Sequence, residues 1–216
     1  GEIVTTIAGR NRLEPVVASA LNGIRIGHID QTDESDLNFL TRLGERYDAI
    51  AAIKAGRMLF TVAGQGLTAS GRAMPAITLT RRDGDQHRYS VTDRDAYSGV
   101  KAYWNDTRGA ERQTVLAGTE ENAKQLRPTY ATEDDALAAA RAEWQRIQRG
   151  LAEFELTLAL GRADLLPETP LTLAGFKPQI DATAWLVSEV THSLNDEGFT
   201  SSIKLETLLH SRTDAR

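Results

Sequence analysis

One strong helical segment, residues 132–150, most constrains the fold of this chain, because strand-like segments lie on both sides of it. Thr132 and Asp135 stand at the two positions of a capping box, and Gly150 supplies a stop. Apolar residues recur on one face of the segment: Leu137, Ala140, Trp144, Ile147 and Leu151. The order of strands, one helix and strands favours an antiparallel sheet or barrel with a packed helix over a parallel βαβ array.

The strands are predicted from alternating apolar and polar residues. Residues 76–93 read as strands joined by a tight hairpin turn at Asp83–Gly84, and 183–206 as a long hairpin with its loop at 195–198. Further strands are expected in 97–106, in 111–118, in 153–161 with Leu160 on the apolar face, and within 167–180. The predicted fold class is therefore α+β but mainly β.

Residues 1–63 read as a small α+β unit. The sequence predicts a helical face near the start, a short strand over 23–29, a helix over 34–46 and a hairpin about the turn 54–57. Glycines and a proline in 64–75 indicate a linker. Residues 209–216 are expected to form a flexible tail. The chain opens abruptly inside an amphipathic pattern, as a piece cut from a longer protein would.

Composition excludes several classes of function. The formal net charge is −5, so no overall basic field attracts DNA or an anionic membrane. There is no cysteine, which excludes disulfides, thiolate zinc sites and cysteine nucleophiles. No apolar run approaches the roughly 20 residues that a membrane span needs.

One short segment looks like a metal or catalytic cluster, because a histidine and four acids fall close together: His28, Asp30, Asp33, Glu34 and Asp36. However, an apolar stripe of helical period follows at once. Acids at a helix start satisfy free backbone N–H groups and the helix dipole. The spacing also fails the calcium-loop template. We therefore interpret the segment as a helix start, with Asp33 or Ser35 as the cap.

The remaining candidates are scattered. His87, His192 and His210 show no metal-ligand spacing, no serine lies in a nucleophile elbow, and 64–71 lacks the lysine of a phosphate loop. The basic stretch 81–88 is typical of a solvated hairpin tip. A pair of carboxylates for glycoside hydrolysis stays possible, because that spacing is three-dimensional. The sequence singles out no catalytic, cofactor-binding or metal-binding residue.

Two stretches resemble a known family. They are "HIDQTDESDLNFLTRLGERYDAIAAIKAGRMLFTVAGQG" and the run from "ATEDDALAAARAEWQRIQRG" through "TAWLVSEVTHSLNDEGFTSSIKLE". Both look like the phage late control gene D protein family, whose members are baseplate hubs of contractile-tailed phages and prophages. The family is related to the hub half of type VI secretion spike proteins. The resemblance spans nearly the whole chain and carries no catalytic motif.

The resemblance implies a structural, non-enzymatic hub of a phage tail baseplate, located in the virion and assembled in the host cytoplasm. It implies that the protein connects tail tube to central spike, contacts other baseplate proteins and forms a homotrimer in the full-length protein. Together with the charge and hydropathy, we expect no cofactor, no sequence-specific nucleic acid and no membrane insertion. Residues 76–208, with helix 132–150, would form the C-terminal tail-tube-like β-barrel, and 1–63 part of the intervening domain. Outward polar rows would face the lumen or an interface: Thr78/Thr80, Glu153/Glu155/Thr157 and Ser188/His192.

Two alternatives stay open. The chain could be a tail-tip module that binds peptidoglycan or degrades the cell wall, because some tail hubs carry lytic domains. A concave pocket with two carboxylates, or a histidine-rich metal site, would favour that alternative. A regulator of late transcription, which the family's name suggests, is disfavoured by the acidic chain and by the lack of a helix-turn-helix pattern.

Overall fold

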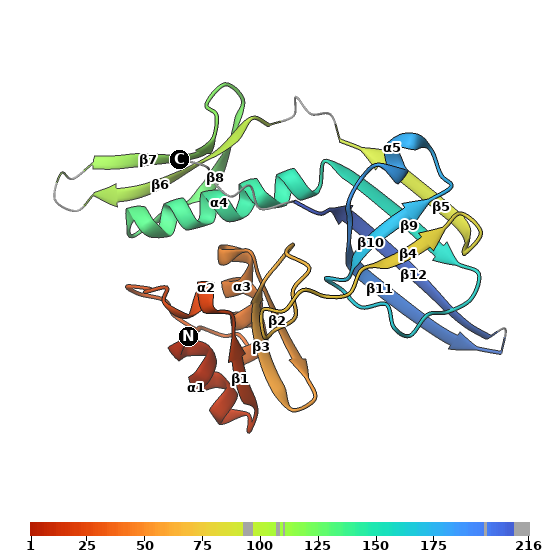
Figure 1. The fold of residues 1–216 in the computed structure, drawn as a ribbon. Coiled ribbons are helices and arrows are strands. Elements are labelled where there is room, and N and C mark those ends of the chain that lie inside the picture. The colour runs from red at the N-terminus through yellow and green to blue at the C-terminus, as the bar shows by residue number, and fades with distance from the viewer. Residues whose placement is uncertain (93–96, 107–108, 110, 197, 210–216) are drawn as a thin grey trace. The chain divides into compact units, whose positions relative to one another are not determined.

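The computed structural model describes residues 1–92, 97–106, 109, 111–196 and 198–209 (Figure 1). By its internal contacts the chain divides into two compact units. Unit 1 comprises residues 1–63 and 94–147, and unit 2 comprises 64–93 and 148–216. The first division falls after Ala63, where the predicted small α+β unit also ends, and the segment 76–208 is shared between the two units. The mainly-β fold class is confirmed.

The first part of unit 1 is the small α+β structure that the sequence predicts. It contains α1 Glu2–Arg10, β1 Glu14–Val17, α2 Ser19–Asn22, α3 Asp36–Tyr47, β2 Ala49–Lys54 and β3 Arg57–Val62. The sheet has the order β1-β3-β2, with β1 parallel and β2 antiparallel to β3. Its core is built from residues of both long helices and β3: Val4, Ile7, Phe39, Leu40, Leu43, Met58 and Phe60.

Two local predictions in this part have opposite outcomes. The hairpin at 54–57 is confirmed, because Ala55 and Gly56 both have positive φ, 49° and 74°, as a two-residue turn between twisted strands requires. The strand expected over 23–29 is wrong, since these residues form an irregular segment. Ile26 and Ile29 pack against the core from that segment, which explains the apolar spacing without strand pairing.

Ser35 is the N-cap of α3. Its hydroxyl accepts a hydrogen bond from the Asn38 N–H at 3.2 Å, and its backbone is extended. Asp33 stands two residues earlier with a φ of 52°. The helix therefore begins two residues later than predicted, at Asp36, with Ser35 and not Asp33 as the cap.

Ser35→Ala is expected to lower the free energy of unfolding by about 1 kcal/mol, because the first turn of α3 loses its side-chain acceptor. Urea denaturation of the purified chain measures this. Ser35→Asn is the matched control, since asparagine caps as well as serine and should leave stability nearly unchanged. A loss of bound metal in the alanine variant would contradict the interpretation of this segment as a helix start.

The second part of unit 1 is a three-stranded sheet covered by the long helix. β6 Gly99–Asp106 lies between β7 Glu111–Gly118 and β8 Ala123–Tyr130, antiparallel to the first and parallel to the second. The helix α4 Glu133–Arg149 begins after Thr132, whose hydroxyl accepts from the Asp135 N–H at 3.2 Å. Alanines on both surfaces allow the helix to approach the sheet closely; this core contains Val100, Ala102, Val115, Ala117, Ala136 and Ala140.

A polar cluster joins the two parts of unit 1. The Arg46 guanidinium on α3 contacts the Asp135 carboxylate at the start of α4, with an N–O distance of 2.7 Å. The Arg46 side chain is 19% exposed and that of Asp135 is 7% exposed. The guanidinium also lies over the rings of Tyr47 and Tyr130, 5.5 and 5.4 Å from their centres, and the Tyr47 hydroxyl donates to Asp135 at 3.2 Å.

Burial raises the pKa of Tyr47 to about 12, against the lowering effect of Arg46. The folded state holds the phenolic proton more tightly than the unfolded chain, in which tyrosine titrates near 10. The resulting stabilisation is complete below pH 10 and is lost as the pH rises from about 10 to about 12. We expect Tyr47→Phe to make the decline of stability over this range shallower, measured by urea unfolding between pH 9 and 11.5. An unchanged decline would show that Tyr47 titrates alike in both states.

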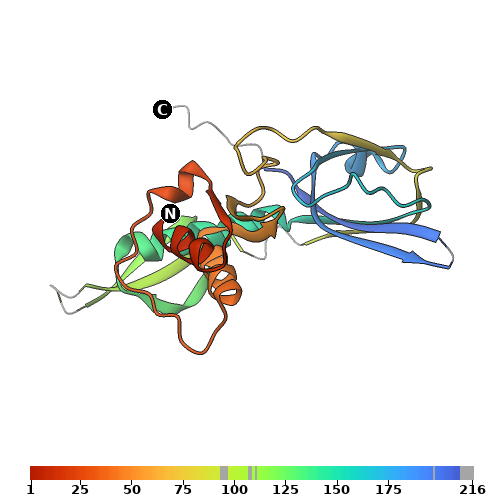
Figure 2. The ribbon, with the colours of Figure 1, turned by 90° about the horizontal axis from the view of Figure 1, so that it is seen from below.

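Unit 2 is a curled six-stranded sheet around its own core (Figure 2). Its elements are β4 Ile77–Thr80, β5 Gly84–Val91, β9 Ala152–Leu158, β10 Pro170–Ala174, the short α5 Pro178–Asp181, β11 Trp185–Asn195 and β12 Gly198–Thr207. The order is β4-β10-β11-β12-β9-β5, and all neighbours are antiparallel except β4 and β10. Trp185 and Phe154 are fully buried in the centre, and the Trp185 indole donates to the Ile180 carbonyl at 2.9 Å.

Three predictions about unit 2 need correction. The long hairpin β11–β12 is confirmed, but the hairpin at Asp83–Gly84 is wrong, because β4 and β5 lie at opposite edges of the sheet. Asp83 closes a turn by accepting from the Thr80 N–H and hydroxyl, and a turn does not require the flanking strands to pair. Leu160 lies beyond the end of β9 and is 80% exposed. The helix α4 was predicted to pack on the same barrel as these strands, but it packs on the separate sheet β7-β6-β8.

The glycine-rich segment 64–75 is fixed within unit 2. The N–H groups of Gly64, Gln65 and Gly66 all donate to the Glu168 carboxylate, at 3.0, 3.1 and 3.2 Å. Glu168 itself has a φ of 69°, unusual for a non-glycine residue. Three converging backbone donors on one carboxylate fix the start of this segment as an ordered loop.

Candidate functional site

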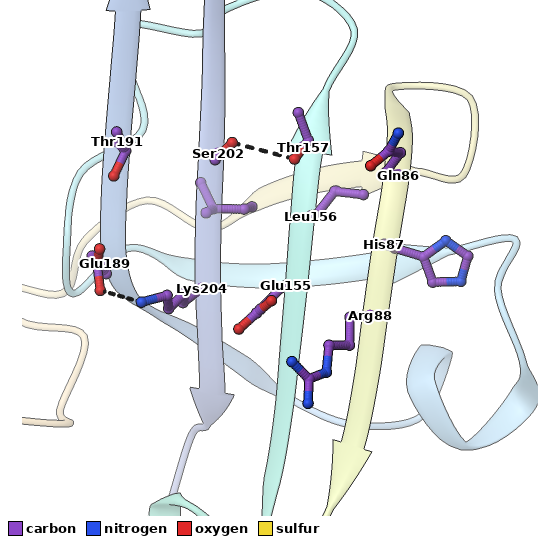
Figure 3. Close-up of a pocket in the computed structure, with 11 residues that line it drawn as sticks. Gln86, His87, Arg88, Glu155, Leu156, Thr157, Glu189, Thr191, Ser202 and Lys204 are labelled. Carbon is purple, nitrogen blue, oxygen red and sulfur yellow. Dashed lines mark hydrogen bonds and ion pairs between the residues drawn. The ribbon is translucent and has the colours of Figure 1, made fainter.

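The outer face of the six-stranded sheet is the candidate functional surface, because polar side chains cover it on every strand. Strand alternation directs apolar residues inward and their neighbours outward. The outward residues of the four strands β5, β9, β12 and β11 line a shallow cavity of about 320 Å³. Their charged side chains form one row across the strands and their neutral side chains form another (Figure 3): Gln86, Arg88, Glu155, Thr157, Glu189, Thr191, Ser202 and Lys204.

One row across this face alternates in charge. Arg88 stands opposite Glu155, Glu155 opposite Lys204, and Lys204 opposite Glu189. The Lys204 ammonium contacts the Glu189 carboxylate at 2.8 Å. The hydrogen bond to Glu189 and the nearby carboxylates of Glu189, Glu155 and Glu153 raise the pKa of Lys204. Opposite charges on directly paired residues stabilise the strand pairing and leave the row electrically balanced.

The next row is neutral. Gln86 pairs with Thr157, Thr157 with Ser202, and Ser202 with Thr191. The hydroxyls of Thr157 and Ser202 lie 3.2 Å apart, at hydrogen-bonding distance. Each row thus contains one side-chain contact between neighbouring strands, Lys204 with Glu189 in the charged row and Thr157 with Ser202 in the neutral row.

The structure places two of the three predicted polar rows on this face. Thr78 and Thr80 point outward on β4, and Glu153 and Glu155 are exposed on β9. Ser188 and His192, however, do not share a face. A β-bulge between Val187 and Glu189 shifts the register, so the Ser188 hydroxyl donates to the Lys204 carbonyl while His192 falls in line with the inward residues.

The three histidines that the structure describes are not brought together. His28 and Asp30 form an exposed pair at 3.0 Å, and His87 packs against the rings of Phe154 and Phe176. His192 lies 2.8 Å from the Ser201 hydroxyl and beside Phe199, and His210 lies outside the described residues. Within the described part of the chain, no three histidine and acidic side chains are grouped for a metal ion. No helix there is long and apolar enough to cross a membrane.

Solved structures of phage tail proteins share this fold. A 43 kDa tail protein of prophage MuSo2 from Shewanella oneidensis matches 94% of this chain and 64% of its own, with a TM-score of 0.62 and 15% identity. A tail protein from Neisseria meningitidis matches 95% of this chain and 65% of its own, with a TM-score of 0.65 and 11% identity. At such identities the likeness establishes the fold alone, and the fold is that of phage tail proteins.

Sequence comparison then gives the family. The model of the phage tail baseplate hub family, GPD, matches residues 1–198. Two proteins described as probable baseplate hub proteins, from Escherichia phages 186 and P2, are 43% and 42% identical to this chain. Each match covers 97% of this chain and 64% of the relative, so the chain spans slightly less than two thirds of the relatives' length. The chain belongs to the phage tail baseplate hub family, which confirms the resemblance and the virion tail as the location of the protein.

Proposed function

We propose that this protein is a structural, non-enzymatic hub that joins the tail tube to the central spike and takes part in baseplate assembly. The observation that carries the proposal is the family match over 1–198. We further propose that unit 2 acts as the tail-tube-like barrel of the hub, with unit 1 as the intervening domain. The full-length protein would assemble as a homotrimer, as the resemblance to the hub family implies.

The polar sheet face supports a lumen role in this proposal. A channel that passes DNA must not bind phosphate, and acidic or paired side chains bind it poorly. On this face each cation has a carboxylate opposite it, and Glu153 adds a negative charge beyond the balanced row. We propose that this face lines the channel of the assembled hub.

The lumen proposal predicts the effect of adding lysines. Glu153→Lys with Glu155→Lys should slow or reduce DNA delivery by intact phage, since exposed lysines attract the phosphate backbone. The matched control is Glu111→Lys with Glu121→Lys, which changes the net charge equally at exposed positions of unit 1. DNA release triggered in vitro measures the rate. Unchanged release in the Glu153/Glu155 variant would count against the lumen role.

A cell-wall hydrolase is the second candidate function, and the cavity on the polar face is where it would act. Glycoside hydrolysis needs one protonated and one ionised carboxyl group. Glu155 and Glu189 are the two carboxylates there, and Lys204 stands between them in the strand register, where a glycosidic bond would have to lie. This arrangement supports the structural role over the hydrolytic one.

Two measurements test the proposed function. Tails purified on a density gradient should contain this protein, and the purified chain should leave the turbidity of a peptidoglycan suspension unchanged. Clearing of the suspension would overturn the non-enzymatic role. Absence of the protein from otherwise complete tails would overturn the hub role.

A further inference from the structure

Asn22 is the one asparagine of the chain that a glycine follows. It is the last residue of the short helix α2, and Gly23 is the C-cap. The backbone nitrogen of the residue after an asparagine can attack the carbon of the side-chain amide. Glycine allows this attack best, because it has no Cβ and reaches the widest range of φ and ψ.

The fold constrains this pair of residues little. α2 is a single turn, and residues 23–34 after it form an irregular segment. Within the described residues the Asn22 side-chain amide makes no hydrogen bond, whereas the Asn11 amide donates to the Asp36 carboxylate at 2.9 Å. Nothing lies within 4 Å of a Cβ placed on Gly23. The amide carbon and the glycine nitrogen therefore have room to turn toward each other.

The surroundings of Asn22 also favour the charge that forms in the reaction. Attack on the amide carbon places negative charge on the Asn22 side-chain oxygen. That oxygen lies 1.9 Å from where a Cβ would stand on Gly1, the N-cap of α1. No side chain caps the first turn of α1, whose N–H groups lack intrahelical acceptors. Free N–H groups and the positive end of a helix both stabilise a developing oxyanion.

The Asp83–Gly84 pair could close the same ring, but its surroundings hinder it. The Asp83 carboxylate accepts from the Thr80 N–H and hydroxyl at 2.6 and 2.8 Å. These hydrogen bonds lower the pKa of Asp83 and keep it ionised, a form that resists attack. Gly84 lies in β5, where a Cβ would come 2.3 Å from Leu156. Two pairs with similar chemistry therefore differ in how the fold holds them.

We propose that Asn22 of the folded protein is a site of spontaneous deamidation through Gly23. The Gly23 nitrogen bonds to the Asn22 amide carbon and gives up its proton, and the side-chain nitrogen leaves as ammonia. A five-membered succinimide results. Water then breaks one of the two ring C–N bonds and restores the N–H, which gives aspartate or isoaspartate. No atom is oxidised or reduced, and water is the only co-reactant. The site does not depend on the proposed function.

Either product alters the small α+β part of unit 1. A carboxylate at position 22 adds negative charge near Glu2, since both residues line a cavity of about 680 Å³. Isoaspartate also inserts a methylene carbon into the main chain next to Leu21, which is 7% exposed and packs in the core. Copies of different age would therefore differ in charge and in local packing.

Peptide mapping of the folded chain tests the site directly. Trypsin cleaves after Arg12 and Arg25 and releases residues 13–25, a peptide with no other asparagine or glutamine. After incubation of the folded chain at mildly alkaline pH, this peptide should gain the mass difference between –NH2 and –OH. The peptide 26–42, in which Asn38 lies within α3, is the internal control and should gain none. Hydroxylamine, which cleaves succinimides, should split the folded chain into fragments 1–22 and 23–216.

Gly23→Ala is the matched variant. Gly23 has a φ of −87°, and an added Cβ meets no neighbour, so the fold accommodates alanine. The variant should gain mass about tenfold more slowly, because the Cβ hinders the approach of the nitrogen. The chain unfolded in urea gives the rate without the fold. Absence of the mass gain from the folded chain, whether or not the unfolded chain shows it, would overturn the proposal. Equal rates in Gly23→Ala and the parent chain would do the same.

Discussion

Asp135→Ala should lower the free energy of unfolding by about 3 kcal/mol, because it leaves the Arg46 guanidinium buried without its carboxylate. The Asp135 side chain is 7% exposed, and Arg46 is enclosed by the Tyr47 and Tyr130 rings. Removing one partner of a buried pair costs more than the pair itself contributes, since the remaining charge cannot return to water. The loss of stability should fall on unit 1, because the pair connects α3 to α4 within that unit.

Asp134→Ala is the matched control for this prediction. Asp134 is exposed one residue earlier and has the same charge near the start of α4. It should cost less than about 0.5 kcal/mol. The double variant Arg46→Met with Asp135→Ala should regain part of the loss, because no uncompensated charge remains. Equal costs for Asp135→Ala and Asp134→Ala in urea unfolding would refute the role of the buried pair.

Glu168→Ala should cost about 2–3 kcal/mol, because three backbone N–H groups lose one charged acceptor. Gly64, Gln65 and Gly66 all donate to this carboxylate, and Glu168 is itself fixed by its N–H bond to the Val187 carbonyl at 2.7 Å. Amide hydrogen exchange should rise at 64–66 well before it rises in the core of unit 2.

Glu168→Gln separates charge from shape in this loop. The amide keeps one acceptor oxygen on the same side-chain length, so it should recover part of the stability and of the exchange protection. If Glu168→Ala leaves exchange at 64–66 unchanged while global stability falls, the carboxylate does not hold this loop.

The local elements were largely predictable from the sequence, but their partners were not. The helix at 133–149, its Thr132 cap and the turn at Ala55–Gly56 follow from periodicity and turn chemistry within a few residues. Alternation says which side of a strand is apolar and does not say which sheet the strand joins. For this reason the parallel pairing of β4 with β10, and the separate sheet under α4, could not be predicted.

The candidate surface was also only partly predictable from the sequence. The rows at Thr78/Thr80 and Glu153/Glu155 lie outward as period-two alternation predicts. One extra residue at the bulge separates Ser188 from His192, and nothing in the local sequence marks that bulge. Glu168 was missed because its partners lie about a hundred residues away in a loop without periodicity.

The central claim is that this protein forms part of the hub between tail tube and spike. The most direct test is an electron cryo-microscopy reconstruction of the baseplate from phage particles that carry it. The account predicts that the curled six-stranded sheet of unit 2 fits density encircling the tail axis between tube and spike, with its polar face toward the axis. Density for this fold only at the tail periphery, or its absence from complete baseplates, would contradict the account.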